Sequence, residues 1–201
     1  MPRKSRRGFN LIEAAIVLGV VGLVIGGIWV AAVSVRSALR VNAYTKNILW
    51  TINQAKRIFP AYSYSTTTQY LLWTYESVDA GVFPKTFIKL PLYAGFREYA
   101  KDSDTGMTLW VTATCNVSIA PCPSLGIGFG MSGSQPYNSD MSPAECTQMV
   151  RRVINALQLS GELISFRLYN GGYTSYTAPI NASLVSCLSS TDYGDFFVKP
   201  Y

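Results

Sequence analysis

Hydrophobic and polar positions divide this chain into a continuous apolar stretch, an amphipathic stretch and a long region of shorter patterns. Residues 14–33 form an unbroken run of 20 apolar residues. A helix of that length crosses the roughly 30 Å hydrocarbon core of a bilayer. The run therefore predicts a helix that is apolar on all sides and is able to span a membrane.

Beyond Val33 the apolar residues recur at steps of three and four among polar ones. They are Val35, Ala38, Leu39, Ile48, Leu49, Ile52, Ala55 and Phe59. This spacing predicts that the same helix continues with one buried face and ends near Pro60. A coiled-coil stalk is the alternative for this half, but its heptads are not sustained.

Shorter patterns follow between residues 60 and 201. Runs of β-branched and aromatic residues with turn residues at their borders predict strands at 108–114, 127–131 and 163–169, and further strands are expected at 184–187 and 196–198. A short helix is expected over residues 76–80. The pattern indicates a mostly antiparallel sheet laid against the long helix, which is an α+β fold.

Ser142-Pro143-Ala144-Glu145 combines a capping box with a proline at the first helical position. It predicts a helix that runs to about Leu159 and is ended by Gly161. Cys146 then lies in the first turn of this helix.

Composition and charge fit one long helix and one globular head in a chain of 201 residues with 49% hydrophobic content. The formal net charge is +6, but four basic residues precede Gly8 and leave only +2 for the rest. The charge therefore gives no indication of nucleic-acid binding. By the positive-inside rule, the basic leader stays in the cytoplasm and the C-terminal part crosses the membrane.

The chain has few groups suited to catalysis or metal binding. It contains no histidine, which excludes histidine-based metal sites and catalytic bases. The glycine-rich segment 126–130 lacks the spacing of a dinucleotide site, and no nucleophile accompanies a base. We therefore expect neither an enzyme nor a cofactor or metal. The four cysteines of an exported chain predict two disulfides, with three possible connectivities.

The segment Gly8-Phe9-Asn10-Leu11-Ile12-Glu13 joins a basic leader to the apolar run. A lone carboxylate beside an apolar helix indicates a functional role and needs a partner. This segment resembles the processing site of type IV prepilins. The resemblance implies that prepilin peptidase cuts between Gly8 and Phe9, that the new N-terminus of Phe9 is methylated, and that Glu13 pairs in assembly with the Phe9 amine of a neighbouring subunit.

Two simpler interpretations of the N-terminus remain. A secretory signal peptide would be cleaved at a small-residue site such as the one around Ala31 and Ala32. A plain membrane anchor would keep the whole segment.

The later part of the chain resembles type IVb pilins in particular, at Asp79-Ala80-Gly81-Val82-Phe83-Pro84 and at the cysteine-bearing helix start Met141-Ser142-Pro143-Ala144-Glu145-Cys146. The resemblance implies a disulfide between Cys146 and Cys187, which leaves Cys115 to pair with Cys122. The eight-residue leader and the mature first residue Phe9 are more typical of type IVa.

The resemblance implies a leader at 1–8, a transmembrane and filament-core half-helix at 9–33 whose hydrophobic part protrudes, an amphipathic half-helix at 34–59, and a head at 60–201 with a disulfide-bounded region at 146–187. It implies the major subunit of a type IV pilus that supports adhesion, aggregation, motility or DNA transfer. The precursor would lie in the bacterial inner membrane and the mature chain in an extracellular pilus. Expected partners are further copies of the chain, prepilin peptidase, the assembly machinery, and a surface receptor or other pili.

Two other functions fit the same sequence. A minor pilin or pseudopilin would share the processing site but prime or cap a fibre. A membrane-anchored adhesive module would keep its leader and would not polymerise.

Overall fold

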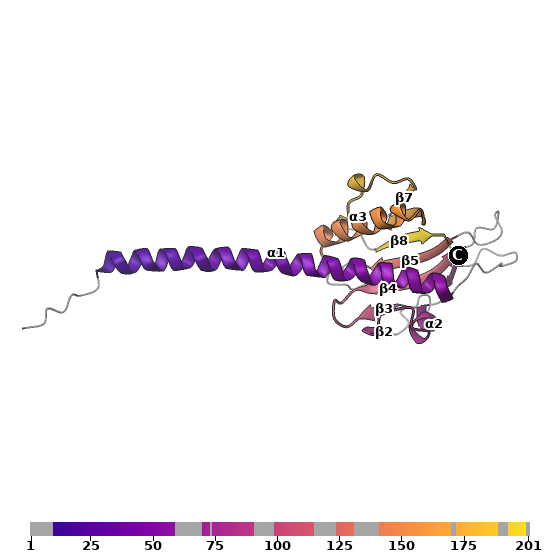
Figure 1. Ribbon diagram of the computed structural model, residues 1–201, viewed down its shortest axis with the longest axis horizontal. Helices are drawn as coiled ribbons and strands as arrows, with labels where there is room; N and C mark the ends of the chain where they lie inside the picture. Colours follow the sequence, from indigo (N-terminus) through magenta and orange to yellow (C-terminus); the bar gives the residue numbers. More distant parts are fainter. Residues whose placement is uncertain are drawn as a thin grey trace, which may run out of the picture. The chain divides into compact units, whose positions relative to one another are not determined.

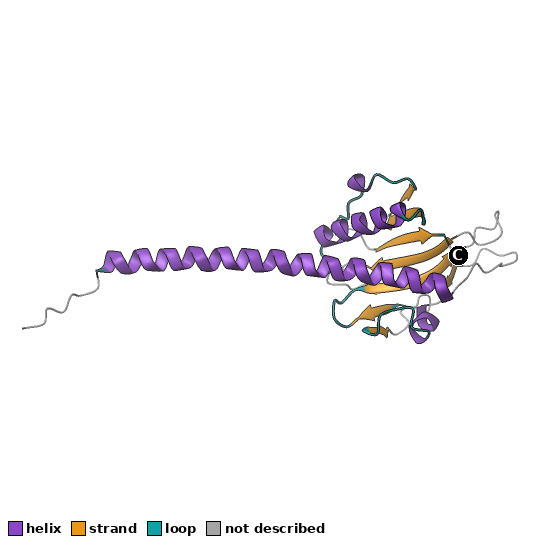
Figure 2. Cartoon of the chain, viewed as in Figure 1, coloured by secondary structure: helices purple, strands orange, loops and turns teal. Residues whose placement is uncertain are grey.

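A computed structural model describes residues 10–58, 70–72, 74–90, 99–114, 124–130, 141–169, 172–188 and 193–199. The chain divides into two compact units, Met1–Leu39 and Arg40–Tyr201, which we treat separately. Helix α1 (Leu11–Ile58) contributes residues to both units. The fold is α+β, with helices and an antiparallel sheet in the second unit (Figure 2).

The two halves of α1 differ in burial as their sequence patterns predict, except that Val35 and Leu39, which were expected on the buried face, are 59% and 63% exposed. Side chains of the apolar run are exposed in the first unit from residue 15 to residue 33, and Ala14 is partly buried. In the second unit one face of α1 is buried, at Val41, Tyr44, Ile48, Ile52 and Ala55. These positions follow one another at steps of three and four, so they form a single stripe along the helix.

The second unit contains one sheet, whose described strands number eight. They are β1 (Tyr70–Leu72), β2 (Phe87–Lys89), β3 (Ala100–Asp102), β4 (Thr108–Thr114), β5 (Ser124–Gly130), β6 (Leu163–Tyr169), β7 (Tyr173–Thr177) and β8 (Tyr193–Val198). The strand order is β2-β3-β4-β5-β8-β6-β7, and β1 pairs with the end of β4. Each of these pairings is antiparallel.

Helices cover one face of this sheet. The second half of α1 and α3 (Pro143–Leu159) lie side by side on that face (Figure 1), and both contribute to the main hydrophobic core. At its centre the rings of Phe129, Phe166 and Phe196 pack together, with centroids 4.8 to 6.4 Å apart. Burial of these apolar side chains is the main stabilising term of the second unit.

The opposite face of the sheet carries a smaller aromatic cluster of Tyr99, Trp110 and Tyr193. Trp110 lies flat over Gly128 of the neighbouring strand, and its indole N–H donates to Asp195 Oδ1 at 3.1 Å. The glycine-rich segment 126–130 is therefore part of a regular strand, β5, in which the missing side chain makes room for a ring.

We expect Gly128→Ala to lower the free energy of unfolding by about 1 to 3 kcal/mol, because the new Cβ would overlap the Trp110 ring and displace it. Gly172→Ala is the matched control, since a Cβ there meets nothing within 4 Å. Chemical denaturation measures both. Equal stability of the two variants would contradict the tight approach of Trp110 to β5.

Several predicted elements are confirmed with small shifts at their ends. Strands at 108–114 and 163–169 are β4 and β6, the strand expected at 127–131 starts earlier as β5, and residues 196–198 belong to β8. The short helix lies slightly earlier, as α2 (Thr74–Asp79). Helix α3 begins with the predicted capping box, in which Ser142 accepts from Glu145 N–H and the Glu145 carboxylate accepts from Ser142 N–H.

The prediction of a strand at Leu184–Cys187 is wrong. Residues Ala182–Leu184 form a 3-10 helix, η1, and the chain continues to Cys187 without strand pairing. Asn181 starts this turn because its Oδ1 accepts from Ser183 N–H at 3.1 Å. The local side-chain to backbone hydrogen bond outweighs the β-branched character of Val185.

Candidate assembly helix and disulfide-bounded region

Glu13 lies in the first turn of α1 and is exposed. Asn10 precedes the helix, and its Oδ1 accepts from Ile12 N–H at 3.4 Å. An acidic side chain at this end of a helix is stabilised by the unsatisfied N–H groups of the first turn. Gly8 and Phe9, the expected processing residues, lie outside the described residues.

The apolar run of α1 presents large hydrophobic side chains on every side. Leu11, Leu23 and Trp29 are 87%, 79% and 73% exposed, and none of the large apolar residues from Leu11 to Val33 is buried. Within the described residues, α1 is the one helix long and apolar enough to cross a membrane. A single copy in water would leave this whole surface hydrated, so the surface requires lipid or other protein as its surroundings.

Polar contacts attach the second half of α1 to the rest of the second unit. Asn47 donates through Nδ2 to Asp102 Oδ2 at 3.0 Å, at the turn between β3 and β4. Near the end of the helix, Lys56 Nζ lies 2.6 Å from Glu162 Oε1, just before β6. These contacts fix the position of this half of α1 along the sheet as well as its buried face.

The pair Lys56–Glu162 is asymmetric, because the Lys56 side chain is 3% exposed and the Glu162 side chain 25%. Removing one partner of a buried ion pair costs about 3 to 5 kcal/mol when the other charge stays buried. We expect Glu162→Gln to lower the free energy of unfolding more than Lys56→Met, since the ammonium is the more deeply buried charge. Urea denaturation of both variants measures this, and a larger loss in Lys56→Met would contradict it.

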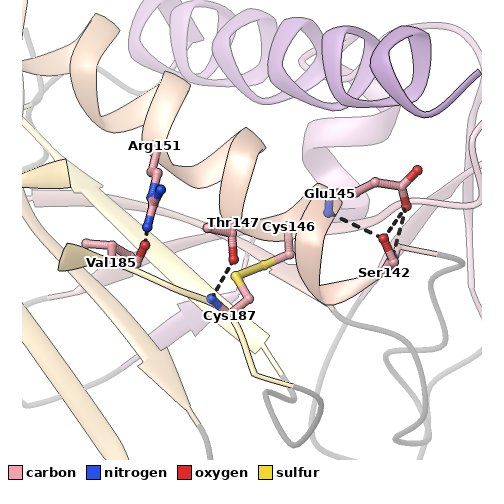
Figure 3. The surroundings of a disulfide bond; sticks show 7 residues. All are labelled: Ser142, Glu145, Cys146, Thr147, Arg151, Val185 and Cys187. Carbon is pink, nitrogen blue, oxygen red and sulfur yellow. Dashed lines mark hydrogen bonds between the residues drawn. A yellow bond between two sulfur atoms is a disulfide. The ribbon is translucent and has the colours of Figure 1, made fainter. Parts of the chain in front are cut away.

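A disulfide joins Cys146, in the first turn of α3, to Cys187, with Cα atoms 6.0 Å apart (Figure 3). It is the pairing that the sequence resemblance implies. The other expected pair, Cys115 and Cys122, lies outside the described residues.

Side chains from α3 hold the segment that reaches Cys187. Thr147 Oγ1 accepts from Cys187 N–H at 2.9 Å. Arg151 donates through Nε to Val185 O at 2.9 Å (Figure 3). It also donates through Nη2 to Ser183 O at 2.8 Å. One covalent bond and three hydrogen bonds thus fasten to α3 a segment that belongs to no strand, and they satisfy three of its backbone groups.

Sequence reasoning identified the capping residues and Cys146 but missed Thr147 and Arg151. The signal was their spacing, because residues four apart lie on the same side of a helix. Thr147 and Arg151 therefore lie on one side of α3, and both bond to the segment that ends at Cys187.

Comparison with models of known families, with curated proteins and with solved structures found no match to this chain. The long apolar helix, the antiparallel sheet and the disulfide are compatible with a pilin-like architecture.

Proposed function

We propose that this chain is the major structural subunit of a type IV pilus, most like type IVb. It is made as an inner-membrane precursor, cut by prepilin peptidase between Gly8 and Phe9, methylated at Phe9 and polymerised through α1. The observation that carries the proposal is the exposure of every large apolar residue from Leu11 to Val33, with one carboxylate, Glu13, at the start.

Burial of this apolar surface supplies the cohesion of the proposed filament. Each Å² removed from water contributes about 25 cal/mol, and the surface extends around the helix rather than along one stripe. Neighbouring helices can therefore cover it from several sides at once. Before assembly the membrane covers this apolar surface, since lipid chains surround apolar side chains as well as protein does.

Glu13 provides register more than net energy. Paired with the Phe9 amine of a neighbour, its carboxylate would be taken out of water, and a buried ion pair often contributes little more than it costs in desolvation. A chain placed one turn out of register would leave both charges without partners, and that penalty selects the correct position.

The second unit has its own hydrophobic core and a disulfide, both made without residues of the apolar run. It can thus stay folded while the first unit moves from lipid into a filament. In the proposed pilus this unit carries the external contacts, in adhesion, aggregation, motility or DNA transfer, with no catalytic role.

The test is the intact mass and N-terminal sequence of protein sheared from the cell surface, measured with and without reductant. We expect an abundant chain that begins at methylated Phe9. A chain that retains residues 1–8 and stays in the membrane fraction would overturn the proposal and support an anchored module. A processed chain present only in traces beside another abundant subunit would show a minor pilin instead.

A further inference from the structure

The strand order of the sheet in the second unit runs from β2 to β7, and the three-residue strand β1 is a further edge beside the end of β4. Strand β7 has the sequence Tyr-Thr-Ser-Tyr-Thr, and four of its five residues are exposed. Among the described residues, β6 is the one strand that pairs with it. An edge strand with unpaired backbone groups is a template for pairing with another chain.

The register shows which backbone groups of β7 face outward. Ala178 N–H donates to Ile164 O at 3.0 Å, one position beyond the pair Thr177–Ser165. Hydrogen-bonded and non-hydrogen-bonded pairs alternate along an antiparallel ladder. Thr174 and Tyr176 therefore bond to β6, whereas the N–H and C=O groups of the residues at 173, 175 and 177 point away from the sheet.

The other edge is protected. Phe87 N–H of β2 is already used, because it donates to Pro84 O at 3.0 Å. Lys89 places a charge on the same three-residue strand and pairs with Asp79 at 2.6 Å. Short length, an edge lysine and internal bonding are the features that keep edge strands from pairing. Strand β7 is longer and contains neither charge nor proline, and within the part of the chain that the structure describes its outward-facing backbone groups have no partner.

We infer that β7 pairs with β7 of a second copy of this chain, antiparallel and centred on Ser175. The strand is complementary to itself in this register. Residue 173 then lies opposite residue 177, and residue 174 opposite residue 176, so each Tyr meets a Thr on either side of the central serine pair. Aromatic and β-branched residues are favourable cross-strand partners, and no like charges oppose one another.

The three outward-facing residues of one strand meet the three of the other in this register. Six backbone hydrogen bonds can form across the two-fold axis, because each hydrogen-bonded pair exchanges two. A contact of five residues a side is small compared with the roughly 1,200 Å² that stable complexes bury. A single contact between two β7 strands is therefore weak. Many such contacts, repeated along two surfaces that each carry several copies of the chain, bind tightly through avidity.

The two-fold symmetry also determines where the contact occurs, in a step that rests on the proposed function. Subunits within a polar filament are related by one repeated heterologous operation, which does not produce isologous contacts. The β7 pair therefore joins chains from two different filaments and leads to lateral bundling.

Cross-linking of the full-length chain in detergent tests the pairing without any filament. In a Ser175→Cys variant, the two thiols face each other in a hydrogen-bonded pair, where Cα atoms lie about 5.5 Å apart and a disulfide fits. Under mild oxidation we expect dimer to form about tenfold faster than in the control Ser103→Cys, an exposed position in the turn after β3. Equal rates in the two variants would overturn the inference.

A second variant measures the reversible contact. Ser175→Lys opposes like charges at the centre of the pair, and we expect it to weaken self-association in sedimentation about tenfold relative to the control Ser103→Lys. Since α1 is the same in both, association through the apolar helix does not affect the comparison. Identical self-association would contradict β7 pairing. Separate, unbundled filaments of Ser175→Lys would support it, whereas absence of filaments in all chains would count against the proposed function alone.

Discussion

Replacing Cys146 and Cys187 together by serine is expected to lower the free energy of unfolding by about 4 kcal/mol. The bond closes a loop with a sequence separation of 41. Such a cross-link removes chain entropy from the unfolded state, by about 4 kcal/mol for a loop of this length. A loss of this size is a large fraction of the roughly 5 to 15 kcal/mol that stabilises a typical domain.

Chemical denaturation of the double variant, followed by the fluorescence of its tryptophans, measures the loss. Ser186→Ala is the control, because Ser186 is exposed in the same segment and should change stability by less than about 0.5 kcal/mol. A double variant as stable as the original chain would show that the three hydrogen bonds from Thr147 and Arg151 hold the segment without the disulfide.

Removal of the Arg151 side chain separates the contribution of its hydrogen bonds to this segment from that of the disulfide. We expect Arg151→Met to leave the disulfide intact and to increase amide hydrogen exchange in residues 182–188, because the carbonyls of Ser183 and Val185 lose their donor. Exchange in α3 itself should change little. Mass-spectrometric hydrogen exchange measures both segments, and unchanged exchange in 182–188 would contradict the role given to Arg151.

The sequence was sufficient for elements whose signals are local and agree with one another. Helix α3 has a cap, a proline at its start and a regular apolar stripe, and all three indicate the same boundaries. Strands β4 and β6 are long runs with turn residues on either side. Where helix or strand propensity, hydrophobic periodicity and end signals agree, tertiary contacts seldom change the type or the bounds of the element.

The sequence was insufficient where partners distant in the chain determine the structure. Strands β2 and β3 have three residues each, too few for a periodic pattern, and they form because they pair with one another. Strand β7 is rich in Ser and Thr and resembles a loop until β6 lies beside it. The pairing of Lys56 with Glu162 likewise joins residues 106 positions apart.

The candidate site shows the same division. The apolar run and the position of Glu13 can be read from the sequence, because side chains point from a helix in regularly spaced directions. The structure adds that this surface is exposed and that Asn10 lies at its start. Which charge meets Glu13 is a property of the assembly, so it stays a prediction.

Replacing Glu13 by valine is expected to abolish filaments while the second unit stays folded. The variant removes the one acidic residue of α1 and would leave the Phe9 amine of a neighbour buried without its carboxylate. An uncompensated buried charge costs about 3 to 5 kcal/mol, which weakens each subunit contact by about 10² to 4 × 10³-fold. Electron microscopy and the yield of sheared protein measure assembly, and the melting curve of the purified chain measures folding.

Two further variants separate charge from shape at this position. Glu13→Gln keeps the size and a hydrogen-bond acceptor, so it should assemble better than Glu13→Val but less well than the original chain. Asp104→Asn removes an exposed carboxylate of the second unit and should leave filaments unchanged. Abundant normal filaments from Glu13→Val would show that apolar burial alone sets the register of α1, and the carboxylate would then need another explanation, such as recognition of the precursor by the peptidase.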